Sequence, residues 1–219
     1  MNIYIVIAAY NEEKNIDNVL KYLSNLNYSI IVIDDGSEDK TSKIVKKYSV
    51  ILLKHIINRG QGASLVTGTK YAYNKGADIV VHFDADGQHL TSEIARVIEP
   101  IINKKVDIVL GSKFLQKNKV PFIKKYFIIK PAIIFNNLIT GIKLTDVHNG
   151  FRALSRKAMS LIDIKQDGMA HASEIISEIK KNKLKYKEVP VTIIYNKFGQ
   201  GLIGGLKILK DLIFNSLTK

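Results

Sequence analysis

The first half of the chain alternates between short apolar runs and segments with helical spacing, and this alternation constrains the fold more than any other feature. The apolar runs are rich in Val and Ile and lack a polar face, which is typical of strands buried on both sides of a sheet. Between the first two runs, apolar residues recur every three or four positions, as on one face of a helix. We expect strands within residues 2–10, 28–37, 50–56, 77–86 and 106–113, and helices within 11–26, 38–49, 59–76 and 91–105.

The second half of the chain departs from this alternation. Residues 114–142 are apolar and rich in Lys, with a partly helical pattern that is interrupted by Pro121 and Pro131. Strands that alternate with helices predict an α/β fold with a mostly parallel central sheet flanked by helices. To this we add a basic apolar helical segment and a C-terminal amphipathic helix. The expected elements are a turn leading into a helix over 145–159, a helix over 173–182, a strand over 185–196 and the amphipathic helix over 202–217.

Two acidic pairs stand at the ends of two expected strands. Asp34 and Asp35 end the second strand, and Asp84 and Asp86 end the fourth. Parallel strands end at the same rim of a sheet, where α/β proteins bind ligands. Because a buried carboxylate without a partner is energetically costly, a positive group is expected beside each pair.

Asp84 and Asp86, followed by Gln88, offer the oxygen ligands that Mg²⁺ and Mn²⁺ prefer. Such ions complete their coordination with water and substrate phosphate. The pattern therefore predicts a metal–diphosphate site with Asp84, Asp86 and Gln88 as ligands. The alternative is a turn in which the Asp side chains only cap backbone amides.

Two further turns are candidates for ligand contact. The Asp-Asp-Gly-Ser turn at 34–37 predicts carboxylate contacts to a nucleoside, with Ser37 able to cap the following helix. Gly60 and Gly62 open the third helix without matching a known phosphate-binding pattern. We interpret these glycines as allowing close packing of the helix on the sheet, and the alternative is direct contact with a phosphate. Thr91 or Ser92 is expected to cap the fourth helix.

The histidines predict no zinc site, because none is paired with another at helical spacing. His82 lies within an expected strand and is interpreted as a packed or hydrogen-bonded core residue. His89 and His148 lie in loops near the proposed site. No Ser-His-Asp set can be assembled, and the Gly-x-Ser-x-Gly pattern is absent.

The formal net charge is +13, and much of it is concentrated in one segment. Residues 108–145 contain seven Lys and no Asp or Glu. A clustered excess predicts a polyanionic partner, although a general enrichment in Lys would give the same count. Nucleic-acid binding would favour exposed aromatic platforms, whereas Lys interleaved with aliphatic residues favours an anionic membrane surface. The alternative is that these apolar residues form a second core layer. The seven are Lys113, Lys117, Lys119, Lys124, Lys125, Lys130 and Lys143.

The remaining features bear on the compartment. The chain has no Cys, so disulfides and thiolate metal sites are excluded. The first residues lack the basic lead-in of a secretory signal, and no apolar run reaches about 20 residues. We therefore expect a cytoplasmic protein, peripheral on the inner face of the cell membrane.

Seven motifs, taken in order, resemble those of family 2 glycosyltransferases with the GT-A fold. The most similar branch is the polyprenyl-phosphate glycosyltransferases of the dolichol-phosphate mannose synthase type. The resemblance implies an inverting transfer of a sugar from a UDP- or GDP-sugar to a polyprenyl phosphate, with Mg²⁺ or Mn²⁺ as cofactor. The motifs are AAYNEE (8–13), VIDDGSEDKT (32–41), NRGQGASLVTG (58–68), DADGQH (84–89), GSK (111–113), TDVHNGFRALSRKA (145–158) and EVPVTIIY (188–195).

The resemblance also implies roles for individual residues. Asp86, Arg152 and Glu174 are the implied catalytic residues, with Glu174 or Asp146 needed as a base only if the acceptor is a hydroxyl. Several positions depart from the family pattern: Ala8 replaces a Pro, Gln61 a Lys, and Lys113 and Lys197 an Arg each. Residues 198–205 also lack the Ser-Lys pair that is usual in this branch. The implied nucleotide-sugar contacts are Ala8, Tyr10, Glu12, Ile33, Asp35, Asp84, Ala85, Asp86, Lys113 and Lys197.

A single catalytic domain with two halves is expected from these assignments. Residues 1–112 form the nucleotide-sugar-binding half, and residues 113–219 form the acceptor-side half with membrane-interface helices. The expected partners are the donor sugar, the lipid phosphate and the membrane surface, without nucleic acid and with room for an integral-membrane partner. Two alternatives stay open. One is a glycosyltransferase that extends a cell-surface polysaccharide or glycan, and the other is a non-catalytic nucleotide- or nucleic-acid-binding module.

Overall fold

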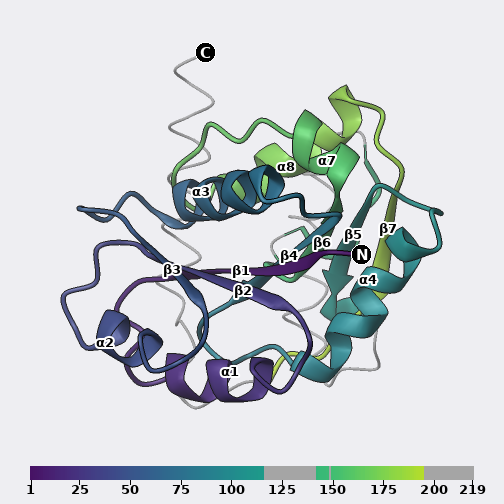
Figure 1. The fold of residues 1–219 in the computed structure, drawn as a ribbon. Coiled ribbons are helices and arrows are strands. Elements are labelled where there is room, and N and C mark those ends of the chain that lie inside the picture. Colours follow the sequence, from purple (N-terminus) through teal and green to yellow (C-terminus); the bar gives the residue numbers. More distant parts are fainter. Residues whose placement is uncertain (116–141, 148, 195–219) are drawn as a thin grey trace, which may run out of the picture.

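The protein, represented by a computed structural model, has a seven-stranded sheet between two layers of helices (Figure 1). The structure describes residues 1–115, 142–147 and 149–194. The strands are β1 (Ile3–Ala9), β2 (Ser29–Asp34), β3 (Ile51–Lys54), β4 (Ile79–Asp84), β5 (Ile108–Ser112), β6 (Arg152–Ser155) and β7 (Tyr186–Pro190). The helices are α1 (Ile16–Leu23), α2 (Thr41–Val45), α3 (Gln61–Asn74), α4 (Ile94–Ile102), α7 (Arg156–Leu161) and α8 (His171–Lys181), with 3₁₀ turns η1 (Thr91–Glu93) and η2 (Lys113–Leu115).

The strand order is β3-β2-β1-β4-β6-β5-β7, and only the pairs that involve β6 are antiparallel. The prediction of a mostly parallel α/β sheet is therefore confirmed. The expectation of a turn leading directly into a helix over 145–159 is wrong, because β6 precedes α7 and lies between β4 and β5. The strand has only four residues and runs straight into a helix. Its short pattern has no periodicity that could identify it.

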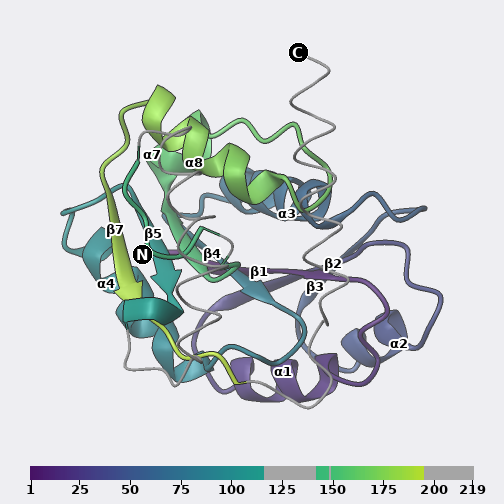
Figure 2. The same cartoon turned by 180° about the vertical axis from the view of Figure 1, so that it is seen from behind.

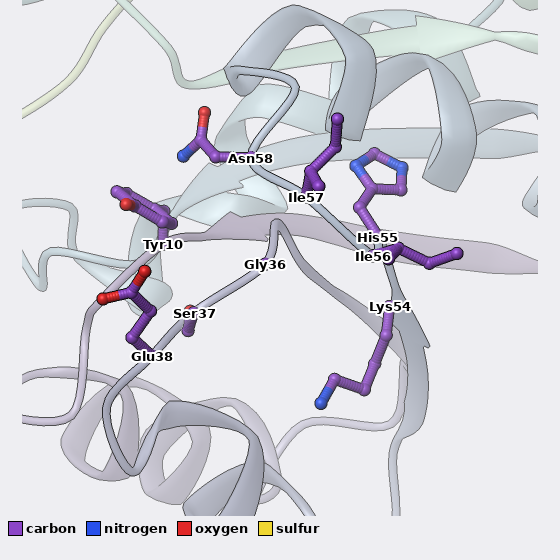
Figure 3. Close-up of a pocket in the computed structure, with 9 residues that line it drawn as sticks. All are labelled: Tyr10, Gly36, Ser37, Glu38, Lys54, His55, Ile56, Ile57 and Asn58. Carbon is purple, nitrogen blue, oxygen red and sulfur yellow. The ribbon is translucent and has the colours of Figure 1, made fainter.

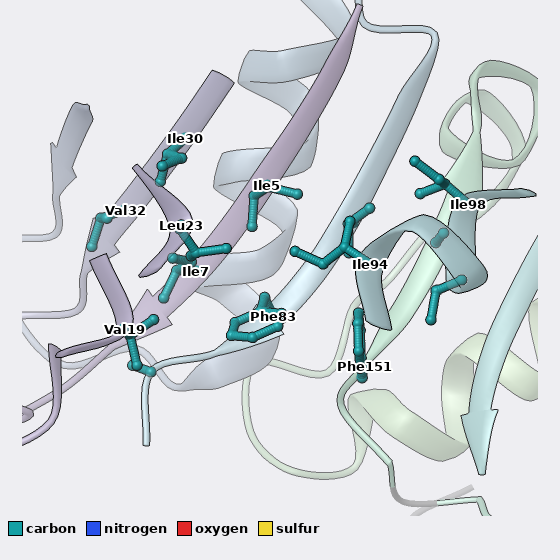
Figure 4. Packing of buried hydrophobic residues seen from close by; sticks show 14 of the residues in the cluster. Ile5, Ile7, Val19, Leu23, Ile30, Val32, Phe83, Ile94, Ile98 and Phe151 are labelled. Carbon is teal, nitrogen blue, oxygen red and sulfur yellow. The ribbon is translucent and has the colours of Figure 1, made fainter. Parts of the chain in front are cut away.

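Each face of the sheet is covered by its own helices, as the two opposite views show (Figures 1 and 2). Along β1, Ile5 and Ile7 pack toward α1 and α4, whereas Val6 packs toward α3, α7 and α8. Figure 4 shows the first of these layers, where Phe83 and Phe151 lie among the aliphatic side chains. Full burial of a side chain such as Ile5 contributes about 1.5–3 kcal/mol.

Helix ends agree with the sequence in part. The expected inward face of α1 is confirmed, since Ile16, Val19, Leu20 and Leu23 are all buried. Gly76 follows the end of α3 with a φ of 81°, a conformation that suits a residue without a Cβ.

The predicted side-chain caps are wrong. Neither Thr91 nor Ser92 caps α4, which follows η1 without a side-chain cap. Ser37 does not cap α2, which starts at Thr41, and its hydroxyl instead accepts a hydrogen bond from the Asn11 amide.

Several predictions fall on residues outside the described ranges. These are the helical part of the basic segment, the C-terminal amphipathic helix, Lys197 and His148. Among the residues that the structure does describe, no helix is both long and apolar enough to cross a membrane.

Candidate active site

The carboxyl ends of β1 and β2 and the segment after β3 border a pocket of about 610 Å³. In Figure 3 the side chains of Tyr10, Glu38 and Asn58 gather on one side of this pocket, and Lys54 extends on the other. Gly36, at the pocket wall, has a φ of 75°, and a Cβ there would lie 2.7 Å from the backbone nitrogen of Asn58. The nine lining residues are Tyr10, Gly36, Ser37, Glu38, Lys54, His55, Ile56, Ile57 and Asn58.

The two loops on one side of the pocket are tied together by reciprocal hydrogen bonds. The amide of Asn11 donates to Ser37 Oγ at 3.0 Å, and the amide of Glu38 donates to Asn11 Oδ1 at 2.9 Å. The amide of Glu12 donates to Thr41 Oγ1 at 2.8 Å. This part of the pocket is therefore fixed before a ligand enters, so binding has less ordering entropy to lose.

Asp35 fixes the opposite side of the pocket. Its side chain is buried, and its carboxylate accepts from the amides of Arg59 and Gly60 at 3.0 and 2.7 Å and contacts His55 Nδ1 at 2.6 Å. A carboxylate has about four acceptor sites. Three are in use, so the predicted nucleoside contact would have to use the one that remains.

Asp84 is held from two directions. Gln61 Nε2 donates to Asp84 Oδ1 at 3.0 Å, and His89 Nε2 lies 2.9 Å from Asp84 Oδ2. Burial alone would raise the pKa of Asp84, but the His89 hydrogen bond and the positive charge of Arg152 lower it below its ordinary value. Asp84 is therefore ionised at neutral pH.

Asp86 has the opposite electrostatic setting. Its Oδ1 accepts a hydrogen bond from the Gln88 amide at 2.9 Å. Burial and the nearby Asp84 charge raise the pKa of Asp86. A carboxylate that is disfavoured in its charged form is one that a cation would stabilise.

The donor set fits a divalent ion that is shared with a ligand. Among residues 1–115, 142–147 and 149–194, no cluster of three or more His, Cys, Asp or Glu side chains is arranged to hold a metal alone. Two carboxylates and the Gln88 amide oxygen would leave coordination positions for water and phosphate oxygens, as Mg²⁺ and Mn²⁺ require.

Gln88 and His89 are also paired with the chain that follows β7. The amide of Ile194 donates to the Gln88 carbonyl at 2.9 Å, and His89 forms an antiparallel bridge with Ile193. Just before this pairing, the buried Glu93 accepts hydrogen bonds from the amide and hydroxyl of Thr192 at 2.8 and 3.0 Å.

Lys113 directly follows β5, and its Nζ lies 3.3 Å from a carboxylate oxygen of Asp146. Glu188 holds the backbone at Asp146, because its carboxylate accepts hydrogen bonds from the amides of Thr145 and Asp146 at 2.9 and 3.1 Å. Asp146 is buried and also contacts Asn149. The carboxylate of Asp146 is therefore engaged by its neighbours.

Arg152 is only 2% exposed, and its guanidinium supports a turn. It donates to the carbonyls of Asn149 and Gly150 at 3.0 and 3.3 Å. Burial lowers the pKa of Arg152 to about 10, so it stays charged at neutral pH. From this position its charge acts on Asp84 and Asp146, and its side chain is not among those that line the pocket.

His82 confirms its interpretation as a core residue. It is buried, and its Nε2 lies 2.8 Å from Thr69 Oγ1. Burial and the neighbouring Arg152 charge hold the pKa of His82 well below its ordinary value, so the ring is neutral.

Glu174, on α8, supports the loop before that helix. Its Oε2 accepts from the amides of Lys165 and Gln166 at 2.9 and 2.8 Å. Its predicted role as a base for a hydroxyl acceptor stays a prediction.

The same loop explains Gly60 and Gly62. A Cβ on Gly60 would lie 3.2 Å from the Gly168 Cα, and one on Gly62 would lie 3.0 Å from the Asp167 carbonyl oxygen. The expected close packing is present, but against this loop instead of the sheet. The Asp167 carbonyl also accepts the hydrogen bond of the Ala63 amide in the first turn of α3.

The remaining predicted nucleotide contacts differ in accessibility. Tyr10 is exposed at the pocket, whereas the side chains of Ile33 and Ala85 are buried. A contact from Ile33 or Ala85 would therefore involve backbone atoms. Ala8 pairs with Ile33 across β1 and β2.

Sequence reasoning missed His55 and Asn58 in the pocket and the contact of Gln61 with Asp84. The motif NRGQG was visible, but nothing in it shows which side chain points to which strand end.

The comparisons with known proteins agree on one family. The description "Glycosyl transferase family 2" matches residues 4–162. The chain is 38% identical to the UDP-N-acetylglucosamine–dolichyl-phosphate N-acetylglucosaminyltransferase of Methanococcus voltae, over 99% of this chain and 97% of that protein. It is 30% identical to the dolichol-phosphate mannosyltransferase of Pyrococcus furiosus, over 97% of this chain but only 62% of that longer protein.

A solved structure shares the fold. Glucosyl-3-phosphoglycerate synthase from Mycobacterium tuberculosis, in complex with Mn²⁺ and UDP-glucose, superposes with a TM-score of 0.77. The match covers 99% of this chain and 78% of that one, at 17% sequence identity.

Proposed function

Because the chain belongs to glycosyl transferase family 2, a family of enzymes, we propose that it transfers a sugar from a nucleotide-diphosphate sugar to a polyprenyl phosphate. The observation that carries the proposal is that Asp84 ends β4 and Asp86 follows it, at the rim that also holds the pocket. The relatives from M. voltae and P. furiosus, whose names specify dolichyl-phosphate acceptors, support the lipid phosphate.

For the donor we propose a UDP-sugar, with UDP-N-acetylglucosamine as the first candidate. The M. voltae relative carries this donor in its name and matches over almost the whole chain. The one unused acceptor site of Asp35 suits a single base N–H, and uracil has one such group on its pairing edge.

The mechanism follows from where charge develops. Asp86, Asp84 and Gln88 would hold Mg²⁺ or Mn²⁺, which supplies positive charge to the leaving diphosphate. Lys113 would add a donor to the same phosphates. The acceptor phosphate is already anionic at neutral pH and would attack the opposite face of the sugar, inverting its configuration. A strong general base is then unnecessary, so Glu174 has no required role in the chemistry.

A lipid acceptor requires the enzyme to work at a membrane. We propose a peripheral location on the inner face, where anionic lipid attracts each nearby Lys with about 1 kcal/mol. Neutralising Lys124, Lys125 and Lys130 together should weaken binding to anionic vesicles more than binding of the donor. Unchanged vesicle binding would remove the membrane role of this segment.

The test of function combines a binding panel with a transfer assay. UDP- and GDP-sugars are compared by thermal shift in the presence of Mn²⁺ or Mg²⁺, because ligands that bind only the folded state raise Tm. The stabilising donor is then incubated with polyprenyl phosphate in vesicles. Sugar found in the lipid fraction supports the proposal. Transfer to a glycan but not to lipid would favour the polysaccharide alternative, and retention on nucleic acid at about 0.15 M salt without donor binding would favour the non-catalytic one.

A further inference from the structure

We propose that His89 and Gln61 are positioning residues that hold the Asp84 carboxylate between them and so fix the direction in which it meets the metal and diphosphate. This inference rests on the proposed function, because it concerns the same site. It assigns a purpose to two side chains that do not themselves touch the reacting atoms.

Within the described residues, the ring of His89 makes a single hydrogen bond, to Asp84. The side chain is 3% exposed, with its Nε2 2.9 Å from Asp84 Oδ2. The ring centroid lies 5.7 Å from that of Phe83 and 5.1 Å from that of Phe151. A carboxylate only accepts hydrogen bonds, so Nε2 carries the proton. Within the described residues Nδ1 is buried and has no partner.

That arrangement would be costly if His89 served only to pack. A buried polar atom without a partner destabilises a fold, and a third aromatic ring would fill the same space without that cost. The contact with Asp84 is the feature that an apolar ring would lack. We infer that the imidazole is retained for its Nε2–H.

Gln61 holds the other oxygen from a different element. It is the first residue of α3, and its Nε2 donates to Asp84 Oδ1 at 3.0 Å. The start of α3 is itself fixed, since the Asp167 carbonyl accepts the amide proton of Ala63. The two donors therefore contact the carboxylate from a helix and from the loop after β4.

With both oxygens engaged, the plane of the carboxylate is set. The lone pairs that remain face a fixed direction, toward which a metal or a ligand donor must come. Loss of one donor would let the group rotate. Partners that orient metal-site ligands typically change metal affinity or activity by about 10–100-fold when they are removed.

The chain offers a matched pair of variants at position 89. His89→Phe keeps an aromatic ring between Phe83 and Phe151 but deletes the donor. His89→Gln can place an amide N–H near the position of Nε2 and restores the donor. Gln61→Met keeps the length of the side chain at a partly exposed helix start and removes the second donor.

The experiment is a Mn²⁺ titration of the full chain in the presence of UDP, read by electron paramagnetic resonance, with Tm measured alongside. We expect His89→Phe and Gln61→Met each to weaken Mn²⁺ binding by about 10–100-fold, and His89→Gln to stay within about 3-fold of the wild type. Steady-state transfer should show the loss mainly in kcat, since the ligand geometry and not the pocket is altered.

Each result leads to one conclusion. If His89→Phe folds and binds Mn²⁺ as the wild type does, or if His89→Gln fails as badly as His89→Phe, the positioning role of His89 is overturned. If His89→Phe does not fold, Gln61→Met decides, and wild-type affinity in that variant overturns the inference. A wild type that binds neither Mn²⁺ nor UDP would overturn the proposed function itself, and that result is visible before any variant is made.

Discussion

Replacing Gly150 by Ala should damage the acidic site through a single methyl group. A Cβ at this position would lie 2.5 Å from Asp84 Oδ1 and 2.8 Å from Asp84 Cγ. Ordinary contacts begin near 3.4 Å, so the carboxylate would have to recede by about 0.9 Å. The backbone of Gly150 is not in the left-handed region, so the added atom itself, and not backbone strain, is the perturbation.

The size of the effect follows from that displacement. A shift of about 1 Å in a positioned group can cost about 100-fold in rate. It would also stretch the bonds of 3.0 and 2.9 Å from Gln61 and His89. Overpacking of this kind costs about 1–3 kcal/mol of stability, and each kcal/mol lowers Tm by about 2–4 °C for a chain of this size.

The assay is sugar transfer to polyprenyl phosphate with saturating Mn²⁺, with Tm followed in parallel. Gly168→Ala is the matched control, because a Cβ there would have nothing within 4 Å. We expect that control to behave as the wild type. Wild-type kcat/KM in Gly150→Ala would show that the position of the Asp84 carboxylate does not limit the reaction.

Three further outcomes are expected. Asp86→Asn should raise the Tm of the metal-free protein. Burial and Asp84 raise the pKa of Asp86, so its ionisation costs stability at neutral pH. The same variant should lose the stabilisation by Mn²⁺, which in the wild type is about 2.7 kcal/mol at a Mn²⁺ concentration of 100 times the Kd. Because the pKa of Asp86 is raised, Mn²⁺ affinity should begin to fall on acidification at a pH above 3.8, the ordinary pKa of an aspartate. A Mn²⁺ affinity that stays constant down to pH 3.8 would refute the assignment of Asp86 as a metal ligand. Glu174→Ala should lower stability by only about 0.5–1.5 kcal/mol, because the exposed amides of Lys165 and Gln166 lose their acceptor but can bind water. In this variant kcat at the pH optimum should stay within about 3-fold of the wild type. A large loss of kcat at unchanged Tm would instead identify Glu174 as the base.

The sheet could be predicted because its strands are long apolar runs and α1 has a clear helical spacing. The shared rim of the two acidic pairs followed, because the carboxyl ends of parallel strands lie at the same edge of a sheet. The register did not follow from the sequence. The strand β6 could not be predicted, because four residues carry no period and its place in the sheet depends on contacts with β4 and β5.

At the site, residue types were easier to predict than their partners. Asp84 and Asp86 could be predicted as site residues because they are charged residues at the end of an apolar run. The sequence could not predict that the Asp35 carboxylate accepts most of its hydrogen bonds from the 55–60 segment. Those contacts join residues about 20–25 positions apart in the chain. Arg152 was singled out for a direct role, yet its burial depends on the same unpredicted strand β6.

The hydrogen bond from the Ile194 amide to the Gln88 carbonyl links the loop after β4 to the segment that follows β7. Translation delivers Gln88 long before Ile194, so the loop that contains Gln88 cannot form this pairing until the segment after β7 has been made. A truncated product that ends before β7 would keep both aspartates and still lack one edge of their support.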